Sequence, residues 1–237
     1  MPQYPVDDNF DFSVGKEVRL YGANFHHIIN VRRHKNGDLI VVRPKDGSFI
    51  SGELVSVQKE SCIICVTDIK PAVQNYLKLT LAMPILKGKS NDFVIEKCVE
   101  SGVTGIIPVF YNRCVPESSS INKKQERWQK IIEETFKQCM APVMPLLMPS
   151  ISSKELFVTK DVTSLIADVH ASDKLDAKPF TDEIIVSIGP EGGFDESEKT
   201  QAAQNGWKSF RLSVNQLKAE TACIVIPAVV RELSLFS

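Results

Sequence analysis

Long hydrophobic runs, an export leader and the common nucleotide-binding motifs are all missing from this sequence. No apolar stretch approaches the roughly 20 residues that a membrane-spanning helix needs. The first ten residues, MPQYPVDDNF, are polar and acidic, unlike a secretory signal peptide. We therefore expect a cytoplasmic protein with reduced thiols and no membrane partner. The formal net charge is only −1, so a nucleic-acid partner would need a local basic patch.

Cysteine spacing gives no sign of a metal site. The six cysteines are scattered along the chain, and only Cys62 and Cys65 have CxxC spacing. No second CxxC and no nearby histidine pair would complete a zinc site, and the two thiols lie in an alternating strand pattern. We expect no bound metal, and a buried structural pair at Cys62 and Cys65.

The composition is that of an ordinary globular protein. Hydrophobic residues make up 43% and charged residues 24% of the 237 positions. A chain of this length forms one large domain or two modest ones, and it can bury a core without disulfides or metals.

The N-terminal quarter reads as a small, partly open β-rich module. Turn signals such as Asn36-Gly37-Asp38 separate short apolar runs, which predicts strands at Glu17–Tyr21, Leu39–Arg43, Ser48–Val57 and Cys62–Val66. Asn24–Val31 has the pattern of one short helix. Asp68–Pro71 looks like a linker, so we divide the chain into domains at 1–70 and 71–237.

Beyond the linker, apolar strands alternate with helical patterns. We predict strands at Tyr76–Pro84, Gly105–Phe110, Ser164–Val169, Glu183–Ile188 and Trp207–Leu212. Helices are predicted at Ser90–Ser101, with Phe93, Val94 and Cys98 inward, at Asn122–Met140, at Asp195–Asn205 and from Ala219 onward. This alternation indicates an α/β domain with a largely parallel sheet.

The sharpest local signal is a loop of five residues between an apolar strand and a capped helix. It consists of Gly189, Pro190, Glu191, Gly192 and Gly193. Glycines let a ligand approach the main chain closely, and ligands of open α/β sheets bind at the carboxyl ends of strands. A tight strand–helix turn with nothing bound is the alternative. The loop is neither GxGxxG nor a P-loop, which disfavours a phosphate cradle.

A second segment, Leu212–Ala222, also follows a strand and opens a helix. Glu220 falls in the first helical turn, where an acidic side chain commonly does no more than complement the helix dipole. Taken with the glycine loop, however, the spacing L-x-x-x-x-L-K-A-E-T-A forms a longer signature.

This combined signature resembles the RsmE family, the 16S ribosomal RNA uracil-N(3) methyltransferases of the SPOUT class. The similarity extends over nearly the whole chain, through His26–Arg33, Leu79–Ala82, Glu96–Val103, Arg127–Ile131 and GPEGGF. It implies a PUA-like RNA-binding β-barrel, followed by a SPOUT α/β domain with a C-terminal trefoil knot that works as a homodimer. Periodicity itself gives no hint of a knot, because knots are rare.

The same resemblance implies S-adenosyl-L-methionine as the cofactor. Two loops would hold it mainly through backbone groups, and their residues are Gly189, Pro190, Glu191, Gly192 and Gly193, with Leu212, Ser213, Gln216 and Leu217. Ribosomal RNA or the small ribosomal subunit would be the partner.

Methylation of uracil N(3) also requires a group that accepts the N(3) proton or stabilises the developing imide anion. The candidates for this catalytic role are Arg113, Lys218 and Glu220. A surface salt bridge for Arg113 and helix capping for Glu220 remain open as alternatives.

RNA binding has support of its own in a local basic stretch. Between residues 19 and 45 the chain carries six cationic side chains, opposed only by Asp38, together with three of its four histidines. The candidate contacts are Arg19, His26, His27, Arg32, Arg33 and Lys35, with Arg43 and Lys45 in the same stretch. A solvated face is the alternative.

Some positions depart from the family pattern. Ser213 stands where the family usually has Gly, and Lys218 stands where it usually has Arg, which keeps the charge but loses the planar fork of guanidinium. Two other functions therefore stay open: a catalytically weakened RNA-binding relative, and a SPOUT methyltransferase that acts on a different RNA.

Overall fold

The computed structural model describes residues 3–6, 10–44, 47–71, 77–114, 121–139, 141–175, 181–212 and 215–234. The chain divides into two compact units, 1–74 with 136–142, and 75–135 with 143–237. No helix in the described ranges is long and apolar enough to cross a membrane.

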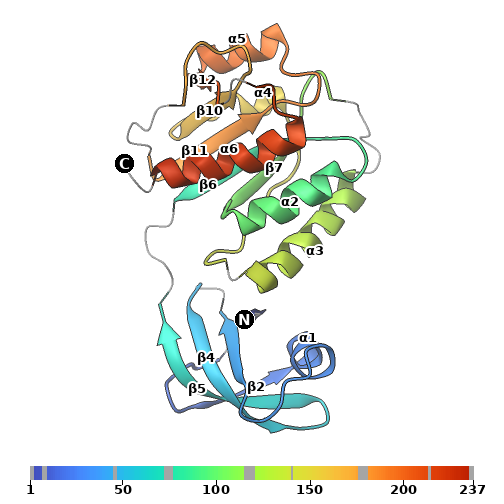
Figure 1. Ribbon diagram of the computed structural model, residues 1–237, viewed down its shortest axis with the longest axis vertical. Coiled ribbons are helices and arrows are strands. Elements are labelled where there is room, and N and C mark those ends of the chain that lie inside the picture. The colour runs from blue at the N-terminus through green and yellow to red at the C-terminus, as the bar shows by residue number, and fades with distance from the viewer. Residues whose placement is uncertain are drawn as a thin grey trace. The chain divides into compact units, whose positions relative to one another are not determined.

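The first unit is built on a mostly antiparallel sheet. Its strands are β1 (Gln3–Pro5), β2 (Glu17–Tyr21), β3 (Leu39–Arg43), β4 (Phe49–Val57) and β5 (Ser61–Lys70). Across the described residues their order is β1-β3-β4-β5-β2, and β1 and β3 run parallel (Figure 1). Alternate residues such as Val18, Leu20 and Ile64 point into one core, as the period of two in a strand requires. The β-rich module predicted from the sequence is confirmed.

The segment after β2 departs from the single helix predicted at Asn24–Val31. One α-helical turn, α1 (Gly22–Phe25), runs into a π-helical turn, η1 (His26–Val31). Here the Arg32 N–H donates to the carbonyl of His27, five residues earlier, at 2.9 Å. The β-branched side chains of Ile28, Ile29 and Val31 are poor helix formers, which fits the wider turn.

The expected buried pair of cysteines is only half correct. Cys62 is fully buried in the core of the first unit, whereas Cys65 is partly exposed. Residues three apart on a strand point to opposite faces of the sheet, so the two thiols of β5 cannot share one core. Burial raises the pKa of Cys62 to about 11, which leaves it as an inert thiol.

The second unit is a three-layer α/β arrangement around a parallel sheet. Its strands are β6 (Lys78–Pro84), β7 (Gly105–Phe110), β8 (Leu146–Leu147), β9 (Ile151–Ser152), β10 (Thr163–Ala167), β11 (Glu183–Ile188) and β12 (Lys208–Phe210). In the described part of the chain the order is β12-β10-β11-β6-β7-β8, with β9 also on β7, and every pair is parallel. This confirms the predicted largely parallel sheet.

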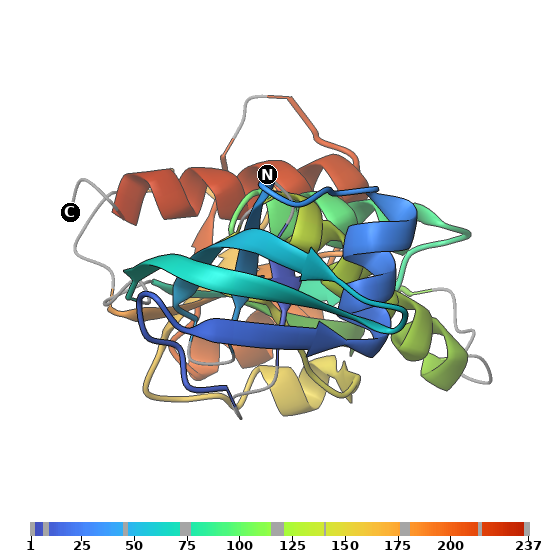
Figure 2. The ribbon, with the colours of Figure 1, turned by 90° about the horizontal axis from the view of Figure 1, so that it is seen from below.

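Helices cover both faces of this sheet. They are α2 (Ser90–Glu100), α3 (Ile121–Cys139), α4 (Ser153–Leu156), α5 (Glu196–Gln204) and α6 (Ala219–Ser234). Figures 1 and 2 show α6 and α2 on one face, and Figure 2 shows α4 on the opposite face. The trefoil knot stays a prediction, since residues 213 and 214, in the second loop, lie outside the described ranges.

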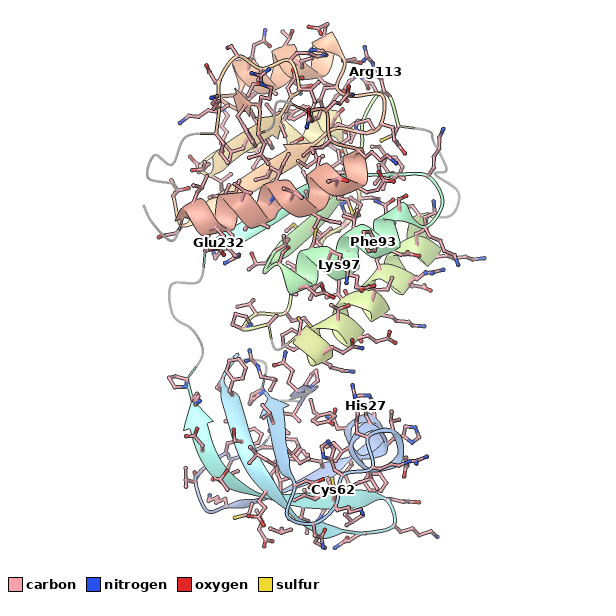
Figure 3. All side chains as sticks on the ribbon, in the orientation of Figure 1. His27, Cys62, Phe93, Lys97, Arg113 and Glu232 are labelled. Carbon is pink, nitrogen blue, oxygen red and sulfur yellow. The ribbon has the colours of Figure 1, made fainter. Side chains whose placement is uncertain are left out.

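Helix α2 packs against α6, where the Cys98 thiol donates to the carbonyl of Cys223 at 3.3 Å. Val94, Ile95, Cys98 and Val99 of α2 are all fully buried. The prediction that Phe93 points inward is wrong, because its side chain is 52% exposed. Figure 3 shows Phe93 and Lys97 on this helix, and the Lys97 ammonium lies 5.9 Å from the centre of the Phe93 ring. The buried apolar residues of α2 therefore start at Val94, one residue later than predicted.

An aromatic cluster fills the core on the face of the sheet that carries α4 and α5. Tyr111 and Phe194 meet edge to face at 5.3 Å between ring centres, and Phe157 and Trp207 do so at 5.1 Å. Such pairs add to the free energy gained by burying the rings. Because Phe194 directly follows the glycine loop, this cluster anchors one end of that loop.

Candidate functional site

The glycine loop begins where β11 ends, at the carboxyl edge of the parallel sheet. The Gly193 N–H donates to the carbonyl of Pro190 at 2.8 Å, closing a turn, and Gly193 has φ +68°. A side chain at Gly189 would meet the Phe194 ring at 3.1 Å, so any larger residue there would force that ring to shift. The predicted strand–loop–helix arrangement is confirmed, and what the loop binds is a separate question.

Arg113 lies against the glycine loop, although 79 residues separate it from Gly192. Its Nη1 donates to the carbonyl of Gly192 at 2.9 Å, and the side chain is otherwise exposed. A Cβ added at Gly192 would stand 3.2 Å from the Cβ of Arg113, so the two residues are closely fitted. Figure 3 shows Arg113 at the end of the second unit that carries α5. The contact holds a cation beside the loop.

A hydrogen-bonded hub joins the end of β7 to the start of α5. The buried carboxylate of Glu198 accepts from the backbone N–H of Asn112 at 2.8 Å and from that of Asp195 at 3.0 Å. Asp195 in turn accepts from the Glu198 N–H and from the Asn112 amide. The predicted capping box of Asp195 and Glu198 is therefore present, and it also ties down Asn112, next to Arg113.

A cleft of about 680 Å³ opens beside the loop, within the second unit. Sites for small organic ligands have volumes of this order, roughly 300–1,000 Å³. Segments distant in the sequence line it, among them the end of β10, the whole glycine loop, and the start of α6. The arrangement thus offers backbone groups from two loops, together with side chains of both charges.

The second predicted loop meets the first one at this cleft. Gln216, Leu217, Lys218 and Glu220 all line it, whereas Leu212 lines a smaller adjoining pocket that shares Asp168, Leu217 and Ala222. Ser213 lies outside the described residues. The Glu220 carboxylate accepts from the Ser90 hydroxyl at 3.1 Å, so it has a partner at the start of α2 as well as a place in the cleft.

Three charged lining residues were not found from the sequence: Asp168, Glu196 and Lys199. The Lys199 ammonium lies 2.8 Å from a Glu196 oxygen and 3.4 Å from an Asp168 oxygen. Its hydrogen bond to Glu196, and the nearby charge of Asp168, raise the pKa of Lys199. Asp168 was missed because the predicted strand Ser164–Val169 included it. In the structure β10 ends at Ala167, so Asp168 lies at the edge of the sheet.

The predicted RNA contacts lie on β2 and on the α1–η1 segment of the first unit. Arg19, His26, Arg32, Arg33 and Lys35 are exposed. His27 is only partly so, because its ring stacks edge to face with Tyr4 at 5.6 Å. Burial lowers the pKa of His27, and the charges of Arg32 and Lys137 lower it further, so this ring is neutral at pH 7. Lys137 thus joins Arg32 as a cation beside His27, and no sequence signal linked the two.

Arg43 does not belong to the basic surface predicted from the sequence. It is 2% exposed, its guanidinium lies 3.5 Å from the centre of the Phe49 ring, and it donates to the carbonyl of Pro142. The Arg43 side chain therefore stabilises the interior of the first unit and is not available on its surface. Lys45 lies outside the described residues.

Comparison with protein families gives two matches along the chain. Residues 73–231 match the model described as RNA methyltransferase domain, which is more than half of the chain. Residues 20–65 match the model described as RNA methyltransferase PUA domain. The two matched ranges fall, respectively, in the parts that carry the cleft and the basic segment.

Individual relatives agree with these matches. The chain is 35% identical over 211 residues to ribosomal RNA small subunit methyltransferase E of Mesomycoplasma hyopneumoniae (strain 232), covering 87% of this chain and 90% of that protein. It is 28% identical to the Bacillus subtilis (strain 168) protein of the same name, covering 86% and 85%. The structure of ribosomal RNA small subunit methyltransferase E from Neisseria gonorrhoeae bound to S-adenosyl methionine is similar over 98% of both chains, with a TM-score of 0.85 and 28% identity.

We predict that Asp195 makes stability depend on pH between about 4 and 2. Hydrogen bonds from Ser197, from the Glu198 N–H and from Asn112 lower the pKa of Asp195 from 3.8 to about 2. A lowered pKa adds stability that is present above pH 4 and is lost as the pH falls through about 2. For a partly exposed group, this adds about 1–2 kcal/mol to the free energy of unfolding. Urea unfolding should show it as a higher free energy of unfolding for wild type than for Asp195→Asn.

This difference should be constant from pH 5 to pH 7 and should shrink below pH 4. Ser197→Ala removes the donor with the largest effect, so the same pH dependence should be weaker in that background. A wild-type advantage that stays unchanged at pH 2.5 would show that the hub does not hold Asp195 ionised.

Proposed function

Because this chain belongs to the ribosomal RNA small subunit methyltransferase E family, we propose that it transfers a methyl group from S-adenosylmethionine to N(3) of a uridine in 16S ribosomal RNA. The cleft at the carboxyl edge of the parallel sheet carries this proposal, since its two loops are those that the sequence assigns to the cofactor. The family match spans the cleft and supports the activity.

The residues that line the cleft fit S-adenosylmethionine in size and in chemistry. A volume of about 680 Å³ accommodates a ligand of that size. Gly189–Gly193 and the segment around Leu217 offer main-chain groups for an adenine edge. The carboxylates of Glu191 and Glu220 suit a cationic ligand, and Lys218 can meet its carboxylate. Bound there, the cofactor would supply a methyl group carried on a sulfonium.

The chain's own task is to orient uracil, exclude water and handle the N(3) proton. Arg113 lies at the loop with donors to spare, so it can stabilise the negative charge that develops on the uracil ring. Lys218 is exposed at the rim of the cleft and can act on the same charge. Glu220, held by Ser90, is the nearby carboxylate that can accept the proton.

We propose that residues 1–70 serve as the RNA-binding module and residues 71–237 as the methyltransferase domain. The exposed cations Arg19, Arg32, Arg33 and Lys35 suit contact with the RNA backbone, together with His26 and His27. A ribosomal RNA substrate also agrees with the expectation of a cytoplasmic protein.

The protein should work as a homodimer. The exposed aromatic ring of Phe93 on α2, and the side chain of Val225 on α6, which is 38% exposed, support an interface on this pair of helices.

Two variants of the cleft should affect cofactor binding and methyl transfer differently. Gly192→Val crowds Arg113 and the loop, so S-adenosylmethionine affinity measured by calorimetry should fall at least roughly 10-fold. Arg113→Ala should keep cofactor binding but slow methylation of small-subunit RNA by roughly 100-fold. Methylation is read as N(3)-methyluridine by mass spectrometry.

Thermal unfolding of both variants, compared with wild type, controls for a general loss of folding. Wild-type protein that binds no cofactor at millimolar concentration would favour an RNA-binding relative without activity. Methylation at another position would make the chain a SPOUT enzyme for a different target.

RNA affinity should depend on the exposed arginines after η1. Arg32→Ala and Arg33→Ala should each weaken binding of a small-subunit RNA fragment a few-fold, and each should reduce the slope of log K against log salt by about 1. Lys70→Ala, at the far end of β5, is the matched control. Equal slopes in all four proteins would exclude this surface as the RNA contact.

Sedimentation equilibrium should give twice the mass of one chain. Phe93→Lys should shift the protein toward monomer, because it puts a charge in the proposed interface, whereas Val158→Lys should not. Val158 is 53% exposed, as Phe93 is at 52%, but it lies beyond α4. A wild-type monomer at micromolar concentration would rule out the dimer.

A further inference from the structure

Asp168 lies at the carboxyl edge of the parallel sheet. Neither the sequence signature nor the comparisons with known proteins assign it a role. It follows β10 directly, just as Gly189 follows β11. The two strands are parallel neighbours, and Ala167 pairs with Ile188, so Asp168 and Gly189 are side by side where the ladder ends. The carboxylate therefore enters the cleft next to the first residue of the loop.

The surroundings of Asp168 fix its carboxylate and balance its charge. The side chain is 11% exposed, the His170 N–H donates to Oδ1 at 3.0 Å, and the Lys199 ammonium lies 3.4 Å from Oδ2. A carboxylate can accept about four hydrogen bonds, so these contacts, the ones made to it by the described residues, leave acceptor positions for a ligand. Lys199 is itself held by Glu196, which keeps the group in place without a ligand.

A carboxylate already paired with a lysine suits a neutral hydrogen-bond donor better than a second cation, because part of its charge is offset. In dinucleotide-binding sheets, a glycine-rich turn follows one strand, and an acidic side chain after a neighbouring strand binds the ribose hydroxyls. Asp168 and Gly189 stand in the same geometric relation, although the sheet and the loop differ from that fold.

We propose that Asp168 is a cofactor-binding residue that accepts hydrogen bonds from the ribose hydroxyls of S-adenosylmethionine; this rests on the proposed function. Lys199 acts as a positioning residue that holds the Asp168 carboxylate toward the cleft. The ribose is shared by substrate and product, so Asp168 contributes to binding both, not to telling them apart.

Calorimetric titration with S-adenosylmethionine and with S-adenosylhomocysteine tests this directly. Asp168→Ala should weaken both ligands by the same factor, about 10- to 100-fold, as expected for hydrogen bonds to a charged group. Asp168→Asn keeps the shape and one acceptor oxygen, so it should fall between wild type and Asp168→Ala. A much larger loss for S-adenosylmethionine would mean that Asp168 faces the sulfonium, and it would overturn the ribose assignment.

A second titration uses the 2′-deoxy and 3′-deoxy analogues of S-adenosylhomocysteine. If Asp168 binds the ribose hydroxyls, removing the contacted hydroxyl should cost wild type affinity but cost Asp168→Ala almost none, as in a double-mutant cycle. Equal losses in both proteins would overturn the proposal. Glu183→Ala, at the opposite end of β11, is the matched control for removal of a carboxylate.

The titrations distinguish an error in the role of Asp168 from an error in the proposed function. Wild-type protein that binds neither ligand would overturn both, because the cleft would not be a cofactor site. Wild-type protein that binds them, with Asp168→Ala unchanged and folded by thermal unfolding, would overturn the role of Asp168 alone.

Discussion

The buried carboxylate of Glu198 holds together the parts on which the candidate site depends. It accepts the backbone N–H of Asn112 and that of Asp195, and so joins the end of β7 to the start of α5 across 86 positions of sequence. Arg113 is next to Asn112, and the glycine loop ends two residues before Asp195. The distance between Arg113 and Gly192 thus depends on hydrogen bonds among Asn112, Asp195 and Glu198, none of which lines the cleft. A buried acceptor with two charge-assisted bonds stabilises such an arrangement by a few kcal/mol, about 1.5–3 per bond.

Much of this architecture was readable from the sequence, because local patterns decide it. The strands Gly105–Phe110 and Glu183–Ile188 were predicted with their observed limits, since each is a continuous apolar run between clear breaks. The capping box of α5 was predicted for the same reason: its two residues are three apart. The errors came where tertiary packing overrides local pattern. Phe93 fits the helical period of α2 but lies outside the stripe that α6 covers.

Of the candidate site, the two loops and Arg113 were identified from the sequence, and the remaining charged residues were not. The glycine pair and the L-K-A-E segment are contiguous in sequence, so they could be found without a structure. Asp168 and Lys199 come together only through the pairing of β10 with β11 and the packing of α5 on the sheet. Arg43 shows the reverse case, since a cation in a basic stretch turned out to lie over an aromatic ring. Charge in sequence does not reveal which side of a strand faces solvent.

The long-range pairing of β6 with β11 has a consequence for synthesis on the ribosome. Lys78 pairs with Glu183, roughly a hundred residues later, and such contacts form slowly because a long loop must close first. The sheet of the first unit needs only residues up to Lys70. A growing chain can therefore form this sheet before β11, the partner of β6, has been synthesised. In the life of each molecule, the sheet beneath the proposed RNA-binding surface can thus form before the proposed methyl-transfer site exists.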